Sequence, residues 1–150
     1  MNVRKAEPKD LDTLVEFTAA EAREAEGHPK PLQTLTKGIQ AALADRSIAM
    51  YWVLIDDDQQ VVGSASALKE WSDWHAGYYW WIQSMYIHPD YRGKGYLHLL
   101  LAAIKAEMHA QHGLELRLYV HEKNATAIRA YQKANFTFSS YKIMVLEPIS

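Results

Sequence analysis

The segment Arg92-Gly93-Lys94-Gly95 combines the residue types that bind phosphate groups. Its two glycines permit tight backbone bends and allow a ligand to approach the main chain closely. Free N–H groups at the start of the helix expected after it favour an anion, and Arg92 and Lys94 add positive charge. The sequence has neither the GxxxxGK(S/T) pattern of a P-loop nor the GxGxxG dinucleotide pattern. We therefore expect a phosphate or pyrophosphate site here rather than a surface turn with solvated basic residues.

The elements on both sides of this segment must position it. Residues 78–87 alternate as a long aromatic strand. The helix after the loop carries one apolar face, and Gly113 is expected to cap it before a strand over 114–120. A strand–helix–strand unit over 78–120 predicts two parallel strands joined by a right-handed crossover. The apolar face of that helix consists of Leu97, Leu100, Leu101, Ile104 and Met108.

The remaining patterns place helices and strands around this unit. Pro8 begins a helix with an apolar stripe at Leu11, Leu14, Val15 and Thr18, which Gly27 ends. Asn124 is a good N-cap for a short last helix. The other expected elements are a helix over 33–45, a hairpin of strands over 48–55 and 61–68, a loop over 69–77, a helix over 125–134 and one or two strands over 136–146. This order predicts one α/β domain over residues 1–150.

Composition excludes several classes of protein. The chain has 150 residues, 16 basic and 18 acidic side chains, a net charge of −2 and no cysteine. The missing cysteines exclude a disulfide scaffold, a thiolate metal site and a cysteine nucleophile. The near-neutral charge argues against a nucleic-acid partner. His109 and His112 share a helix face without a third ligand, so no metal site is expected. The N-terminus lacks a signal peptide, and no apolar run approaches the ~20 residues of a membrane helix, so we expect a cytoplasmic protein without a membrane partner.

Aromatic residues concentrate in the middle of the chain. Of 17 Phe, Trp and Tyr residues, nine lie between Trp71 and Tyr96. Ring faces there could wall an acceptor pocket and attract an ammonium group. The same residues could fill the core or form a dimer interface, where Trp and Tyr are enriched. Both interpretations stay open.

Two longer segments resemble the motifs of one enzyme family. Residues 85–95 resemble motif A of the GNAT acetyltransferases, and residues 124–136 resemble motif B. The resemblance covers nearly the whole chain and implies the GNAT fold: a mixed, mostly antiparallel sheet of six to seven strands, with helices on both faces and a splayed parallel strand pair. Two positions depart from the motifs. Leu97 stands where the family usually has Gly or Ala, and Asn135 replaces a Gly but tolerates a left-handed helix cap.

The resemblance implies acetyl-CoA as the donor and no metal. The pantetheine arm would follow the backbone of the 78–87 strand, where a bulge would expose an N–H to the thioester oxygen. Tyr131 would be the general acid that protonates the coenzyme A thiolate. The acetyl-CoA-binding residues implied in this way are Met85, Tyr86, Ile87, Arg92, Gly93, Lys94, Gly95, Tyr96, Leu97, Asn124, Ala127 and Tyr131.

The base for the acceptor amine is left open by the sequence. Many relatives place a Glu on the strand before motif A, but this chain has Gln83, which cannot act as a base. A water held by Gln83 and Ser84 could serve, or a side chain from a flanking loop: Glu70, Asp73, His75, Glu26 or His28. The candidate residues of the acceptor pocket are Glu26, His28, Trp71, Asp73, His75 and Gln83.

The predicted activity is an acetyl-CoA-dependent N-acetyltransferase acting on a primary amine of a small molecule, peptide or protein. Since there is no cysteine to carry the acetyl group, transfer is expected to be direct, in a ternary complex. The alternative is an acyl-CoA-binding sensor without turnover. A homodimer is expected from the Trp-rich strand and a swapped or paired C-terminal strand, as in many relatives.

Overall fold

The computed structural model describes residues 1–148 and divides into two compact units, Met1–Tyr119 and the chain from Val120 on. The prediction of one domain over the whole chain stays a prediction. The first unit contains β1 (Asn2–Lys5), the short 3-10 helix η1 (Pro8–Asp10), α1 (Leu11–Glu26), α2 (Leu32–Ala44), β2 (Met50–Ile55), β3 (Val61–Ser72), β4 (Gly77–Ile87), the 3-10 helix η2 (Pro89–Tyr91), α3 (Leu97–Ala110) and β5 (Glu115–Leu118). The second contains α4 (Ala125–Lys133). None of the described helices has the length and apolarity needed to cross a membrane.

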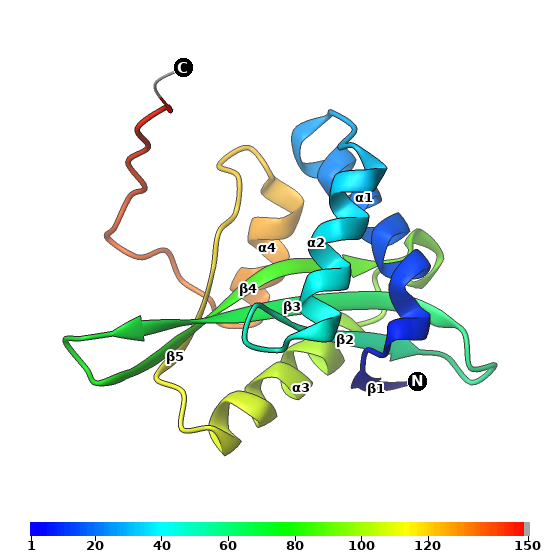
Figure 1. The fold of residues 1–150 in the computed structure, drawn as a ribbon, viewed down its shortest axis with the longest axis horizontal. Helices are drawn as coiled ribbons and strands as arrows, with labels where there is room; N and C mark the ends of the chain where they lie inside the picture. The colour runs from blue at the N-terminus through cyan, green and yellow to red at the C-terminus, as the bar shows by residue number, and fades with distance from the viewer. Residues whose placement is uncertain (149–150) are drawn as a thin grey trace. The chain divides into compact units, whose positions relative to one another are not determined.

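The first unit is built on one mixed sheet with strand order β1-β2-β3-β4-β5 (Figure 1). The first four strands pair antiparallel, and β4 pairs with β5 in parallel. Since α3 lies between β4 and β5 in the chain, the predicted strand–helix–strand unit is confirmed.

Strand β2 shows how the two faces of the sheet are covered. Val53 and Ile55 pack in one cluster with Leu14 of α1 and Ile39 of α2. The alternate residues of the strand, such as the buried Leu54, face the opposite side, where α3 lies. The predicted burial of this strand on both faces is therefore confirmed, and α1 lies on the face opposite α3.

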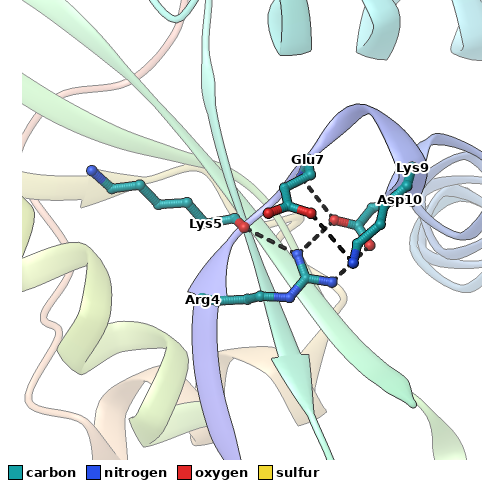
Figure 2. A network of polar contacts seen from close by, with 5 residues as sticks. All are labelled: Arg4, Lys5, Glu7, Lys9 and Asp10. Atoms are coloured by element: carbon teal, nitrogen blue, oxygen red, sulfur yellow. Dashed lines mark hydrogen bonds and ion pairs between the residues drawn. The ribbon is translucent and has the colours of Figure 1, made fainter. Parts of the chain in front are cut away.

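The N-terminal end of α1 is fixed by a network around a buried carboxylate (Figure 2). Asp10, 5% exposed, accepts hydrogen bonds from Arg4 Nη1 at 2.8 Å and Nη2 at 3.0 Å, and from the Glu7 N–H at 2.7 Å. Burial opposes ionisation of Asp10, but the Arg4 hydrogen bonds and the Glu7 N–H lower its pKa below the ordinary value. The ion pair ties β1 to the start of the helix.

Two glycines were predicted to end helices, and only one of them does. Gly27 ends α1 with a left-handed φ of 75°, as predicted. The predicted Gly113 cap of α3 is wrong, because α3 ends at Ala110 and His112 adopts the positive φ of 59°. A Cβ on Gly113 would lie 2.8 Å from Trp80 Nε1 and against the Met108 side chain. The glycine is therefore required by close packing on the buried Trp80.

The strand number differs from the expectation. The sheet has five strands rather than six to seven, and the predicted strands over residues 136–146 are wrong, since these residues form no strand. A strand exists only when a backbone partner accepts its hydrogen bonds, and the described residues supply none to this segment. Its apolar side chains stay exposed, Met144 at 95% and Leu146 at 92%.

Other differences concern lengths. The predicted loop over 69–77 is largely strand, because β3 and β4 pair to Ser72↔Gly77 and leave only residues 73–76 as the turn. Strand β1 was not predicted, because four residues with two charges carry little strand signal.

Candidate active site

A bulge interrupts the pairing of β4 near its middle. The register between β3 and β4 shifts between Ser66 and Ala67, so that Gln83 has no partner across the ladder. Pairing between β4 and β5 reaches only to Ile82↔Leu118. Residues 83–87 of β4 thus have no strand neighbour on that side within the described part of the chain. The predicted bulge and the limited contact of the parallel strands are confirmed.

A carboxylate from α1 lies against this stretch of β4. The Met85 N–H donates a hydrogen bond of 2.6 Å to Glu21 Oε2. Burial raises the pKa of the Glu21 carboxyl to about 7, opposed by the Met85 N–H and assisted by the negative charge of Glu24. At neutral pH this carboxyl therefore exchanges its proton readily.

Three cross-strand neighbours place further polar groups beside Glu21. Tyr51, Ser66 and Ser84 are in register across β2, β3 and β4, on the face that α1 covers. The Ser66 and Ser84 hydroxyls are 2.6 Å apart, and Ser66 Oγ donates to Gln83 Oε1 at 3.4 Å. Burial raises the pKa of Tyr51, while its hydrogen bond with Ser66 lowers it and the charge of Glu21 raises it. Hydroxyl, amide and carboxyl groups thus surround the bulge.

The predicted phosphate site follows β4 directly. Gly93 and Gly95 have φ angles of 75° and 81°, which L side chains rarely adopt. The N–H groups of Gly93, Lys94, Gly95 and Tyr96 donate no hydrogen bond to any group within residues 1–148. Four main-chain donors at the start of α3 are consequently available to an anion.

Arg92 is held between β4 and α1. Its Nε donates to the Ile87 carbonyl at 2.7 Å, and its Nη2 contacts the two Glu24 carboxylate oxygens at 2.9 and 3.1 Å. Its guanidinium carbon lies 5.2 Å from the centre of the Tyr86 ring. The positive charge is therefore held beside the loop, although Glu24 partly neutralises it.

The aromatic residues of β4 divide between the two faces of the sheet. Tyr79 and Trp81 share one face with Arg117 of β5, whose guanidinium carbon lies 3.5 Å from the Tyr79 ring centre. Tyr119 stacks on Trp81 with centroids 4.5 Å apart. Trp80, on the other face, is fully buried. The core interpretation is therefore correct for Trp80, whereas Tyr79 and Trp81 are partly buried and are covered by Arg117 and Tyr119.

The structure does not gather all the acceptor candidates. Asp73 and His75 are exposed in the β3–β4 turn, and Trp71 beside them is 58% exposed. This turn is about 20 Å of strand away from the bulge at Gln83, at ~3.3 Å per residue. Glu26 forms an ion pair with Lys30 at 2.8 Å, and His28 is exposed after the end of α1. What the structure does bring together is Met85 of β4 and Glu21 of α1, with Gln83 two residues before Met85 on the same strand.

The second unit carries the motif B residues. Asn124 caps α4, its side chain accepting a hydrogen bond of 3.1 Å from the Ala127 N–H. Tyr131 is partly buried, and its ring meets Phe136 edge-on at 5.5 Å. Asn135 adopts the left-handed φ of 73°, as predicted.

Glu21 was missed by the sequence reasoning. It lies one helical turn after Phe17 and two after Leu14, and so continues the apolar stripe that faces the sheet. A carboxylate at a stripe position is the signal that could have identified it. Within residues 1–148, no cluster of three His, Asp or Glu side chains is arranged to hold a metal ion.

Comparison with known proteins agrees with this fold. The model of the acetyltransferase (GNAT) family matches residues 12–136. A possible acetyltransferase from Clostridium difficile 630 is 34% identical, with 99% of this chain and 98% of that chain covered and a TM-score of 0.91. The chain therefore belongs to the GNAT acetyltransferase family.

Two more distant structures share the fold. A predicted acetyltransferase with acetyl-CoA from Clostridium acetobutylicum is 20% identical, with 97% and 95% of the chains covered and a TM-score of 0.80. A ribosomal-protein-alanine N-acetyltransferase from Brucella melitensis biovar Abortus 2308 is 16% identical, with 98% and 99% covered and a TM-score of 0.79. No match was found among curated protein sequences. Enzymes of this family use acetyl-CoA, so acyl transfer is the class of chemistry that this fold carries.

Proposed function

We propose that this protein transfers the acetyl group of acetyl-CoA directly to a primary amine, on a small molecule or a peptide, in a ternary complex. The observation that carries the proposal is the loop after β4, with two glycines at positive φ and four N–H groups free to bind an anion. This is the kind of site that a pyrophosphate requires. Arg92 and Lys94 add the charge that a coenzyme A phosphate would meet.

Acetyl-CoA also needs a place for its pantetheine arm, and the unpaired half of β4 is suited to it. The backbone of Met85, Tyr86 and Ile87 would hydrogen-bond its amides. The thioester oxygen would accept the N–H exposed at the bulge, and this would stabilise the oxyanion of the tetrahedral intermediate.

Departure of the coenzyme A thiolate needs a proton. A thiol has an ordinary pKa of roughly 8.5, so a nearby phenol can protonate the sulfur as the C–S bond breaks. We assign this role to Tyr131, and we keep Asn124 and Ala127 as proposed contacts of the coenzyme. Since the chain lacks cysteine, attack on the thioester falls to the amine itself.

The acceptor is expected to be cationic before it reacts. Carboxylates at Glu21, Glu24 and Glu26 line the C-terminal half of α1. A cytoplasmic location, where acetyl-CoA and small amines meet, is part of the same proposal.

The test is thiol release from acetyl-CoA in the presence of a panel of diamines, amino sugars and peptides. The proposal expects steady turnover with at least one amine. Tight acetyl-CoA binding by calorimetry with no turnover across the panel would favour the alternative, an acyl-CoA-binding sensor.

We also propose a homodimer. The segment 136–148 exposes large apolar side chains, among them Phe138 at 68% and Val145 at 76%. Exposed apolar groups of this extent are typical of interaction surfaces. Light scattering is expected to give a dimer mass, and the double variant Ile143→Lys, Val145→Lys is expected to give a monomer. Ser139→Lys in the same segment is the control that keeps the dimer.

A further inference from the structure

We propose that the Glu21 carboxylate accepts the proton that the acceptor amine must lose before it attacks the thioester. This inference rests on the proposed function and supplies the base that the sequence left open. The base would then come from α1 rather than from β4, the loop after α1 or the turn between β3 and β4.

Glu21 lies beside the stretch of β4 that is expected to bind the thioester. Glu21 Oε2 is 2.6 Å from the Met85 nitrogen, in the stretch of β4 that follows the bulge and has no strand neighbour. The thioester carbonyl is expected to lie against this same stretch. A carboxylate there would lie beside the reacting carbon, whereas Asp73 and His75 lie at the far end of the hairpin.

Among the described residues, no cation is paired with Glu21. The charged and titratable groups that face Glu21 are Glu24 on its own helix and Tyr51 on β2, and neither is positive at neutral pH. Arg92, from the loop after β4, is engaged with Glu24. No recorded ion pair in residues 1–148 involves Glu21. A partly buried carboxylate without a counter-ion attracts an incoming ammonium group.

Glu21 and bound acetyl-CoA would compete for one N–H group, that of Met85. The Met85 N–H now donates to Glu21, and a carbonyl oxygen of bound acetyl-CoA would replace the carboxylate there. Binding of acetyl-CoA would then free Glu21 for the amine. The same raised pKa that burial produces suits a base working near neutral pH.

The step balances as follows. The ammonium nitrogen gives one proton to Glu21, and its lone pair forms the N–C bond at the thioester carbon. The tetrahedral intermediate then breaks the C–S bond, and the sulfur leaves with that electron pair and takes a proton from Tyr131. The remaining ammonium proton of the product passes to water, as does the proton on Glu21, and water reprotonates Tyr131.

The experiment compares the wild type with Glu21→Gln, Glu21→Asp and the control Glu16→Gln, which changes an exposed carboxylate of the same helix. The amine is the one found by thiol release, and kcat and kcat/KM are both measured from pH 5.5 to 9. We expect Glu21→Gln to lower kcat at least about 100-fold and to remove the rise in rate between pH 6 and 8. Glu21→Asp should recover part of the rate, and Glu16→Gln should match the wild type.

Binding and spectroscopy separate this role from a structural one. The Kd of acetyl-CoA should change by less than about threefold in Glu21→Gln. The Met85 amide resonance should follow a titration near pH 7 in the wild type and lose it in Glu21→Gln and when acetyl-CoA is bound. A Glu21→Gln variant with wild-type kcat and pH profile, or a Met85 amide that does not titrate, overturns the inference and leaves the proposed function standing. A wild type without turnover on any amine overturns the proposed function, and this inference with it.

Discussion

The Met85 N–H of β4 donates its hydrogen bond to the Glu21 carboxylate of α1, at 2.6 Å. In a continuous sheet this N–H would donate to a neighbouring strand. Here it donates to a side chain, which can move away when another acceptor binds. The carboxyl is partly buried without a cationic partner, an arrangement that costs stability. Such a cost is typical of a functional site.

The first prediction concerns the stability of Glu21→Gln. The pKa of this carboxyl is about 7 in the folded protein and 4.5 ordinarily, so the folded state holds the proton more tightly between these values. Folding stability therefore falls as pH rises from 4.5 to 7, and glutamine removes this fall. At pH 8 we expect Glu21→Gln to be more stable than the wild type by up to about 3 kcal/mol, and at pH 4 nearly equal to it. Urea unfolding at both pH values measures this; lower stability of the variant at pH 8 would refute it.

The second prediction concerns Arg92. Arg92→Ala removes a guanidinium held beside the loop by Ile87 and Glu24. Loss of a charge-assisted contact to a phosphate, about 1.5–3 kcal/mol, corresponds to a rise of roughly tenfold or more in the KM for acetyl-CoA. Lys105→Ala, an exposed change on α3, is the control. An unchanged KM in Arg92→Ala would remove this residue from the phosphate site.

The third prediction concerns the leaving group. Tyr131→Phe removes only a hydroxyl, and the ring contact with Phe136 is expected to persist. We expect kcat to fall by roughly 100-fold while calorimetry gives nearly the wild-type affinity for acetyl-CoA. Tyr141→Phe, in the exposed C-terminal segment, should have no effect. An unaltered kcat in Tyr131→Phe would exclude the residue as the acid.

The fourth prediction compares two glycines in thermal unfolding. Gly113→Ala places a methyl group against Trp80 and Met108, which should lower stability by about 1–3 kcal/mol. Gly38→Ala, in α2 with no atom within 4 Å of its Cβ position, should raise it by about 1 kcal/mol. Equal stability of the two variants would contradict the packing around Trp80.

The fold could be predicted from the sequence wherever a pattern was long and local. The apolar stripe of α3, the strand β2 buried on both faces and the Gly27 cap all depend on neighbours within one element. The C-terminal strands could not be predicted, because pairing depends on a partner that alternation does not reveal. The short β1 could not be predicted for a similar reason, because its extended structure depends on pairing with β2.

The candidate site was predicted only in part. The glycine loop and the bulge follow from motifs in continuous sequence, so Gly93, Gly95 and the strand before them were found. Glu21 and Glu24 precede that strand by about 60 residues and meet it only because α1 packs on β4. No spacing rule links residues so distant. Glu26 and His28 at the end of the helix were considered as loop residues, whereas Glu21 lies inside the helix, on the apolar stripe that was assigned to the core.

The most direct test of the account is the fate of the acetyl group. Acetyl-CoA labelled with ¹³C in the acetyl carbons is incubated with the wild type and the best amine of the panel, and the products are analysed by mass spectrometry. The account predicts the labelled acetyl group on the amine nitrogen, one per coenzyme A released, and none on the protein. Label retained in acetyl-CoA with every amine, or an acetylated protein intermediate that passes its label on, would contradict direct transfer.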